Sequence, residues 1–316
     1  MKLTTLPFFD RLEHSQRILL AGMGGGFDLY CGLPLYFALT EAGKSVTLAN
    51  LTFANTRRIT PRLEEAAVEV TARSGQARGY FPERHLCAWM EEETGEPFSI
   101  VCFERHGAVA LREAYQRVVE HFDIDALVLV DGGTDALMRG DEAGLGTPHE
   151  DILSLAVTHD LDIPTKLMAC LGFGIDAFHG VCHAHMLENV AELAKNDAFL
   201  GTFSLLKQMS EAQRYLKAVD YSNTRTPGLE SIVNNSIASA VEGHYGNHHR
   251  TNRVRQSRLW INPLMSIYWA FELAPVAERI LYLDHIKDTE TFQDVIVALE
   301  AWERDRPRRP RRDIPV

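Results

Sequence analysis

The sequence predicts a Rossmann-like α/β fold, with a mostly parallel sheet, helices on both faces and a more helical C-terminal region. Two observations support this prediction. Short apolar runs of strand length alternate with helical patterns through the first 200 residues. Runs such as ILLA at 18–21 and ALVLV at 126–130 are apolar throughout, which is typical of strands buried on both faces of a parallel sheet.

The strands are predicted from these apolar runs and from the turn residues that bound them. They are Arg17–Gly22, Ser45–Ala49, Ala66–Ala72, Ser99–Phe103, Ala126–Asp131, Lys166–Leu171 and Ile280–Asp284.

Helix starts and ends can also be predicted. Pro82 suits the first position of a helix that ends near Gly95. Thr147 and Glu150 have the spacing of a capping box, which predicts a helix start there. After about Phe199 the helical patterns are Leu205–Ala218, Ser231–Val241, Pro263–Ala277 and Thr291–Trp302.

These patterns predict one domain over residues 1–303, with a sheet-rich core at 1–200 and a mainly helical completion at 201–303. Residues 304–316 are rich in Arg and Pro and have no apolar period, so a disordered basic tail is expected there.

Composition restricts the class of partner. The net charge of −11 argues against nucleic acid binding, and no apolar run is long enough to cross a bilayer. The five cysteines are scattered without CxxC spacing, which favours reduced thiols. We therefore expect a cytoplasmic protein with a small-molecule partner, no nucleic acid or membrane partner, and room for a homo-oligomer.

Three predicted strands are followed by glycine-rich turns that also carry aspartate: GGGFD at 24–28, DGGTD at 131–135 and GFGID at 172–176. Ligands of open parallel sheets bind outside the carboxyl ends of the strands, and glycine lets backbone amides approach them. For any single turn, a tight connection is the alternative. The ligand-binding residues predicted from these turns are Gly24, Gly25, Gly26, Asp28, Asp131, Gly132, Gly133, Thr134 and Gly174.

The glycine pattern does not identify a nucleotide. There is no Walker motif, and Phe27 stands where the third glycine of the dinucleotide fingerprint belongs. A phosphorylated or nucleotide-like ligand is compatible with the turns, but NAD is not predicted.

The stretch from 131 to 151 is crowded with carboxylates. Asp131, Asp135, Asp141 and Glu142 follow one strand, with Arg139 as a counter-charge. Such a group could hold hydrated magnesium, bind ribose hydroxyls or supply a general base. A solvated loop is the alternative.

The stretch GFGIDAFHGVCHAHMLENVAEL places His183 and His185 at a helix start. Together with Asp176, His179 and Glu188 they could ligate a metal, transfer protons or simply pack.

A basic, His-rich loop follows at 242–258. It could act as a lid that brings positive charge to an anionic substrate, or it could be an exposed loop; its arginines are Arg250, Arg253, Arg255 and Arg258. Asn234 could complete the site.

The motifs GGGFD, DGGTDALMRGDEAGLGTPHED, GFGIDAFHGVCHAHMLENVAEL, SIVNNSIASAVEG and INPLMSIYW resemble those of an uncharacterised prokaryotic family, domain-of-unknown-function family 1152. The resemblance runs from about Arg17 to Trp302, so the basic tail lies outside it. It implies a single Rossmann-like unit and transfers no reaction. The motif positions that it carries over are Gly24 to Gly26, Asp28, Asp131 to Asp135, Asp141, Glu142, Asp176, His179, His183, His185 and Glu188.

We therefore expect an enzyme that acts on a small anionic or nucleotide-like metabolite by hydrolysis, elimination or group transfer. Acid–base chemistry would fall to Asp135 or Asp176 with His183 or His185. Two alternatives are a non-catalytic nucleotide sensor and a metal-dependent hydrolase that uses Asp176, His183 and His185. The cofactor stays open between a nucleotide and a divalent metal ion.

Overall fold

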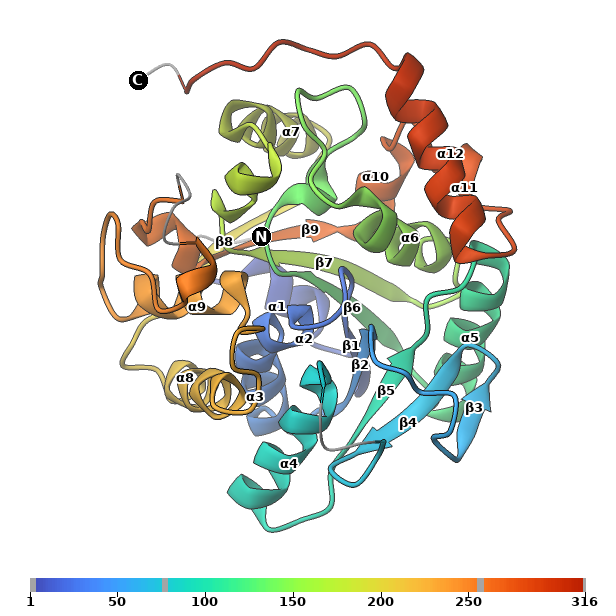
Figure 1. Cartoon of the computed structure of the whole chain (residues 1–316), viewed down its shortest axis with the longest axis vertical. Helices are drawn as coiled ribbons and strands as arrows, with labels where there is room; N and C mark the ends of the chain where they lie inside the picture. The colour runs from blue at the N-terminus through green and yellow to red at the C-terminus, as the bar shows by residue number, and fades with distance from the viewer. Residues whose placement is uncertain (1–3, 76–78, 255–258, 315–316) are drawn as a thin grey trace.

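Nine strands form one sheet in the computed structural model, which describes residues 4–75, 79–254 and 259–314 (Figure 1). Their order across the sheet is β3-β4-β5-β2-β1-β6-β7-β9-β8. The strands are β1 (Arg17–Gly22), β2 (Ser45–Leu51), β3 (Arg62–Glu64), β4 (Ala67–Thr71), β5 (Ser99–Phe103), β6 (Ala126–Asp131), β7 (Thr165–Leu171), β8 (Phe199–Ser204) and β9 (Ile267–Glu272).

The middle of the sheet has the Rossmann-like order that the sequence predicts. Strands β5, β2, β1, β6 and β7 are parallel, and the chain winds outward in opposite directions from β1 and β6. A ligand crevice is expected at that switch point. Gly22 pairs with Val130 and Asp131 pairs with Cys170, so β1, β6 and β7 end level with one another.

Antiparallel strands complete both edges, and here the prediction is wrong in places. Residues 263–277 were predicted to be helical but contain β9, which pairs with β7 and β8. A short apolar run such as IYWAFE has no period that separates a buried strand from a helix. The predicted strand Ile280–Asp284 is instead a turn that leads into helix α11 (Leu283–Ile286).

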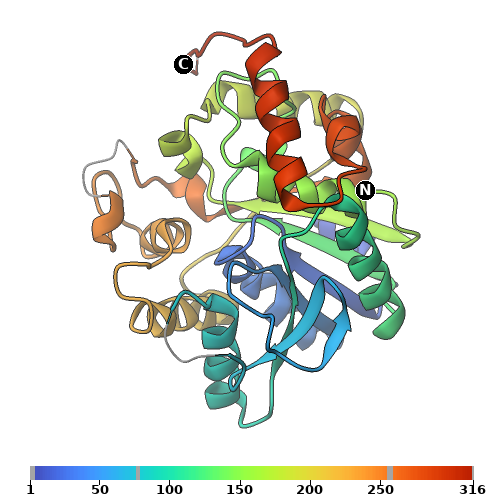
Figure 2. The same ribbon diagram turned by 45° about the vertical axis from the view of Figure 1, so that its right-hand side comes forward.

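Helices cover both faces of the sheet (Figures 1 and 2). Ile18 and Leu20 of β1 pack with one layer, whereas Leu19 and Ala21 pack with the other, which explains why the strand is apolar throughout. The first layer contains α1 (Pro7–Arg11), α2 (Asp28–Cys31), α3 (Leu33–Glu41), α4 (Pro82–Thr94), α8 (Ser210–Asn223) and α9 (Ile232–Val241). The second contains α5 (Ala108–His121), α6 (Pro148–Thr158), α7 (His183–Lys195), α10 (Leu273–Glu278), α11 and α12 (Phe292–Asp305).

The structure confirms the predicted helix starts at Pro82 and after Thr147, but not the predicted capping box. Helix α4 begins at Pro82 and ends at Thr94, and it is capped by Gly95, whose φ of 75° is left-handed. Thr147 precedes α6, but its side chain makes no capping hydrogen bond. The hydroxyl is oriented toward Asp135 and Asp151 instead. The observed capping box is at Thr291 and Asp294 of α12.

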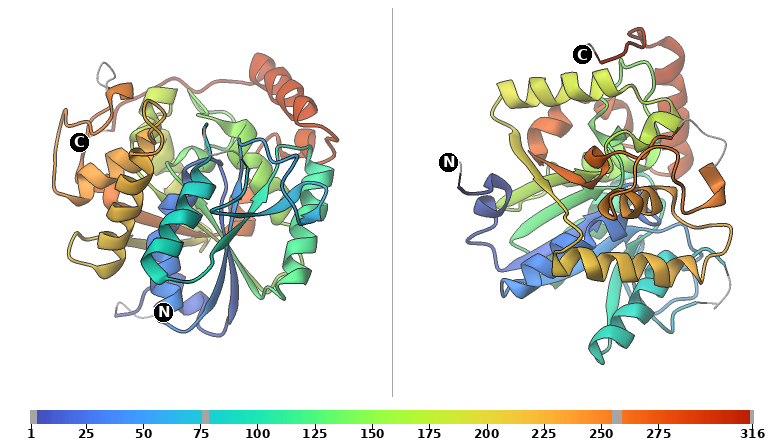
Figure 3. Two further views of the ribbon diagram at one scale, coloured as in Figure 1. Left: turned by 60° about the horizontal axis from the view of Figure 1, so that its bottom comes forward. Right: turned by 90° about the vertical axis from the view of Figure 1, so that its left-hand side faces the viewer.

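The segment after α12 was expected to be disordered. In the structure, residues 306–314 run past the start of α7 and contact the loops on that side of the molecule (Figures 1 and 3). Among the described residues, no helix is long and apolar enough to span a membrane.

Candidate functional site

The three glycine turns contribute to one cavity of about 210 Å³ at the switch point of the sheet. The turn after β1 supplies Gly24, Gly25 and Asp28, and the turn after β6 supplies Asp131, Gly132 and Asp135. Asp176 and His179 come from the turn after β7. Residues separated by about 150 positions in the chain therefore share one crevice because the three strands end level.

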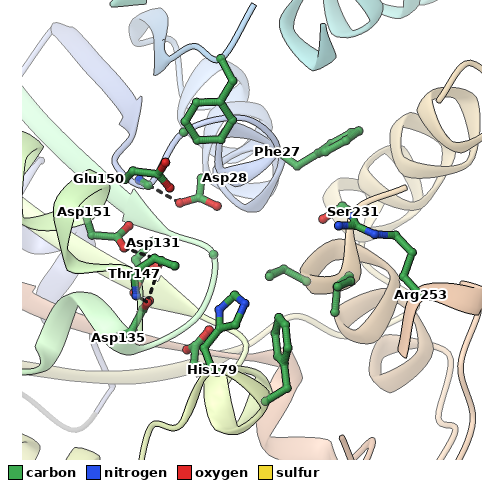
Figure 4. A pocket seen from close by; sticks show the side chains of 18 of the residues that line it. Phe27, Asp28, Asp131, Asp135, Thr147, Glu150, Asp151, His179, Ser231 and Arg253 are labelled. Carbon is green, nitrogen blue, oxygen red and sulfur yellow. Dashed lines mark hydrogen bonds between the residues drawn. The ribbon is translucent and has the colours of Figure 1, made fainter. Parts of the chain in front are cut away.

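Three carboxylates converge on one wall of this cavity (Figure 4). One oxygen from each of Asp28, Asp131 and Asp151 lies within 4.8 Å of the other two. They come from the start of α2, the end of β6 and the first turn of α6. Asp28 is half-buried, whereas Asp131 and Asp151 are only 1% and 2% exposed.

Backbone amides of the turns hold the carboxylates in place. The amide of Gly24 donates to Asp28 at 2.9 Å, that of Thr134 to Asp176 at 2.6 Å, and that of Thr147 to Asp135 at 2.7 Å. The amide of Gly26 donates to the Leu51 carbonyl. The amides of Gly24, Gly26 and Thr134 were expected to bind an anionic ligand. In the structure they donate to oxygen atoms of the protein instead.

The glycines are needed because the carboxylates lie against the backbone. A Cβ at Gly24 would be 2.2 Å from Asp151 Oδ1 and 2.4 Å from Asp28 Oδ2. At Gly146, whose φ is 71°, a Cβ would be 2.1 Å from Asp135 Oδ2. The turns therefore leave room for acidic side chains, which also accounts for the pairing of glycine with aspartate in the sequence.

Burial and mutual repulsion raise the pKa values of these acids. Burial, with the Asp135 charge as the next cause, raises the pKa of Asp28 to about 8. The same two causes hold the pKa values of Asp131, Asp151 and Asp176 well above the usual range for aspartate. Burial raises the pKa of Glu150 to about 7. The wall is therefore short of positive charge, and a cation bound there would favour the ionised carboxylates.

The opposite wall is formed by the N-terminus of α9 and by Arg253 (Figure 4). Ser231 caps this helix, and Ile232 and Val233 of its first turn line the cavity. Arg253 donates from Nη1 to the Glu230 carbonyl at 2.7 Å. Aromatic side chains complete the lining: Phe27, Phe53, Tyr80 and Phe178.

Of the other arginines in the basic loop, Arg250 is described and does not line the cavity. Arg250 pairs with Asp220 at 2.6 Å. Arg255 and Arg258 lie outside the described residues.

His183 and His185 are not in the cavity. His183 lines a separate hollow with Trp260, and its Nε2 lies 3.4 Å from the Gly174 carbonyl oxygen. His185 is buried, and its Nδ1 accepts from the Ala143 amide. Among the described residues, Asp28, Asp131 and Asp151 form the group with metal-ligand spacing, and the predicted set of Asp176 with His183 and His185 does not.

Asp141, Glu142 and Glu188 serve ion pairs away from the cavity. Asp141 pairs with Arg139 at 2.8 Å, and all three acids contact Arg309. These pairs hold the pKa of Asp141 below its usual value, with the Arg139 hydrogen bond as the largest cause.

Asn234 lies beneath the site. It donates from Nδ2 to the Phe27 carbonyl at 3.0 Å and accepts from Tyr215. Asn234 does not line the cavity; it positions the turn that carries Phe27.

Several lining residues were missed by sequence reasoning. The sequence predicts Thr147 and Glu150 only as partners in a capping box, and it gives Asp151 no role beyond ending the acidic stretch 131–151. Phe53 follows β2 at the same edge of the sheet, so its place in the chain was a usable signal. Phe178 lies between Asp176 and His179 in the turn after β7, so the same signal applied to it. Tyr80 had no such signal, because a loop brings it to the cavity.

The chain was compared with known proteins. A family model described as "Protein of unknown function (DUF1152)" matches residues 19–302. This range includes every lining residue of the cavity and ends before the basic C-terminal segment. No curated protein matches the chain.

Proposed function

The chain belongs to the DUF1152 family, and we propose that it is an enzyme that binds a divalent cation through Asp28, Asp131 and Asp151 and acts on a small metabolite beside it. The convergence of these three carboxylates at the switch point of the sheet is the observation that carries the proposal.

The charge balance of the wall supports a cation. Within the described residues, none of these three carboxylates forms an ion pair, although Asp131 and Asp151 are almost fully buried. Buried charges without a partner are strongly unfavourable. Carboxylate oxygens suit hard cations such as Mg²⁺, Mn²⁺ and Ca²⁺, and a bound cation would supply the missing positive charge.

A bound divalent cation would polarise an oxygen of the metabolite and neutralise charge that develops on it. Proton transfer would fall to the chain's own Asp135 and His179, both of which line the cavity. Thr147 fixes Asp135 through its amide and its hydroxyl, at 2.7 and 3.0 Å. Burial lowers the pKa of His179, which favours a neutral imidazole that can accept a proton. His179 thus takes the role that the sequence analysis gives to His183 or His185.

The size and the opposite wall of the cavity indicate the substrate class. A volume of about 210 Å³ holds about seven waters at ~30 Å³ each, so the bound part of the substrate is small. The α9 N-terminus and Arg253 favour an anionic group on it. We propose hydrolysis, elimination or group transfer on a small anionic metabolite that bridges the cation and this wall.

The proposed setting is the cytoplasm, without a nucleic acid partner. All five cysteines are free and buried, which fits a reducing compartment. The net charge of −11 disfavours contact with phosphate backbones.

Cation binding can be tested by calorimetric titration of Mn²⁺ into EDTA-stripped protein. We expect the native protein and an Asp288→Asn control to bind alike, because Asp288 is exposed and does not line the cavity. Asp151→Asn should weaken binding at least about tenfold. In thermal unfolding, Mn²⁺ at about 100 times its Kd should stabilise the native protein by about 2.7 kcal/mol. Equal affinity in native protein and Asp151→Asn would refute this cation site.

Turnover is tested separately. Mn²⁺-loaded protein is incubated with a panel of small phosphorylated and carboxylated metabolites, and consumption is followed by mass spectrometry. Asp135→Asn and His179→Ala should lose turnover at least about a hundredfold and keep Mn²⁺ affinity. A ligand that binds but is returned unchanged would contradict the enzyme proposal and favour a sensor.

A further inference from the structure

We infer that residues 306–312, here named the C-terminal strap, clamp two loops that support the cavity and set how readily these loops open. The loops are residues 139–146, before α6, and residues 175–182, before α7. The strap follows the residues matched by the family model, so it is an addition to the matched unit. The inference does not depend on what the cavity binds.

The strap holds the first loop through two arginines. Arg309 donates from its amide to the Asp141 carbonyl at 2.8 Å and from Nε to Asp141 Oδ1 at 3.0 Å. Its Nη2 lies 3.4 Å from Glu142 Oε1. Arg306 is 7% exposed and donates to the Glu142 carbonyl at 2.6 Å.

The same segment also holds the second loop. Arg311 donates to the carbonyls of Gly180 and Val181 at 3.1 and 3.3 Å. The Cys182 thiol donates to the Arg312 carbonyl at 3.1 Å. Arg309 and Arg312 both pair with Glu188 of α7, which fixes the strap beyond the end of the loop.

The two loops are tied to each other and to the cavity. A Cβ at Gly144 would be 2.3 Å from the Gly180 carbonyl oxygen, so the loops touch at backbone distance. Gly146 packs on Asp135 at the end of the first loop, and the second loop supplies Asp176 and His179. The strap does not line the cavity, but its movement would shift the two loops and, through them, the side chains that line the cavity.

Ion pairs make up part of the strap's contact with the rest of the molecule. Arg309 joins three acidic side chains and is about a quarter exposed, at 27%. Pairs of this kind weaken as salt rises, because the Debye length falls to a few ångströms near 1 M. We therefore expect loop opening to increase with ionic strength.

Cys182 reports on the strap. All five cysteines are buried, and Cys182 is 1% exposed beneath Arg312. We propose to measure labelling by a thiol reagent in full-length Arg309→Gln and in Arg308→Gln. Arg308 lies in the strap and is a matched control, because its guanidinium donates to the Glu303 carbonyl of α12.

Arg309→Gln should add one fast-reacting thiol, labelled at least about tenfold faster than in the native protein, because three charge-assisted contacts are lost. Arg308→Gln should label like the native protein. Adding Cys182→Ser to Arg309→Gln should remove the fast phase. About 0.5 M NaCl should accelerate labelling of the native protein more than labelling of Arg309→Gln.

Hydrogen exchange locates the opening. Arg309→Gln should increase exchange in 139–146 and 175–182 and leave β6 protected. If Arg309→Gln unfolds β6 as well, Arg311→Gln serves instead. The Arg311 guanidinium donates to the second loop, so its loss should loosen 175–182 alone. The inference is overturned if the informative variant labels Cys182 at the native rate, or if Arg308→Gln accelerates labelling equally.

Discussion

At the scale of the residue, Gly24 shows how the absence of a side chain can define a charged site. Its α-carbon faces Asp28 and Asp151, and its amide donates to Asp28 at 2.9 Å. The residue thus brings two acids together and fixes one of them. Space for the carboxylates, rather than a positive φ, is what requires glycine at position 24.

Gly24→Ala should displace at least one of the two carboxylates and weaken Mn²⁺ binding at least about tenfold. Gly43→Ala is the control, since no atom lies within 4 Å of its Cβ position, although its φ of 82° makes alanine strained. It should cost about 1–2 kcal/mol of unfolding free energy and leave Mn²⁺ affinity unchanged. Calorimetry and urea unfolding separate the two effects, and equal Mn²⁺ affinity in both variants would contradict the role given to Gly24.

Residue patterns indicated part of the cavity. Asp28, Asp131, Asp135 and Asp176 follow strands directly, and level strand ends place them together. Asp151 needed the orientation of α6, which brings its side chain back toward β1. His183 and His185 lie outside the cavity, and the sequence could not show this, because their position depends on the 3₁₀ helix Ile175–His179, whose shape the sequence does not reveal.

At the scale of the element, two threonines in similar contexts have different tasks. Thr291 caps α12 through a reciprocal box with Asp294. Thr147 precedes α6 but donates to Asp135 and Asp151. A cap serves the helix that follows it, whereas Thr147 serves side chains from two elements.

Thr291→Ala should lower the free energy of unfolding by about 1 kcal/mol without changing Mn²⁺ affinity. Thr147→Val should change the free energy of unfolding less than Thr291→Ala does. It should weaken Mn²⁺ binding, because the hydroxyl that orients Asp135 and Asp151 is lost. Urea titration and calorimetry on the two variants check this. The assignment fails if Thr147→Val destabilises the fold as a lost cap would and binds Mn²⁺ normally.

The elements differed in how predictable they were. The predicted strands Arg17–Gly22, Ser99–Phe103 and Ala126–Asp131 are confirmed to the residue, because both of their faces are buried and turns bound them. Strand β8 was missed because its sequence, FLGTFS, has neither a continuous apolar run nor a regular alternation of apolar and polar residues, and Gly201 lies in its interior. Strand β9 was taken for helix because its partners, β7 and β8, lie far back in the chain.

At the scale of the whole molecule, buried acids make stability depend on pH in an unusual direction. The pKa values of Asp28, Glu150 and Glu83 are raised to about 8, 7 and 7, with burial as the largest cause. The folded state therefore binds more protons than the unfolded state between the ordinary carboxyl pKa near 4 and these values. Their contribution to stability is present below pH 4 and is lost as pH rises toward 8.

In EDTA, the free energy of unfolding should fall between pH 6 and pH 9, with a limiting slope of about 1.4 kcal/mol per pH unit for each proton released. The melting temperature should fall with it. Added Mg²⁺ should reduce the fall, because a cation favours the ionised carboxylates of the cavity. Asp28→Asn should flatten the EDTA profile, whereas Asp288→Asn should not. Calorimetric scans across this range provide the measurement, and a flat profile for the native protein in EDTA would contradict it.

The position of β9 has a consequence for synthesis on the ribosome. It lies between β7 and β8 in the sheet, yet it is translated after both of them and after α8 and α9. The outer edge of β7 therefore stays without its neighbour until residue 272 has been added, and β8 has no place to dock before then. A nascent chain stalled before that point presents an open strand edge that can pair with other chains, so a chaperone would be needed at this stage.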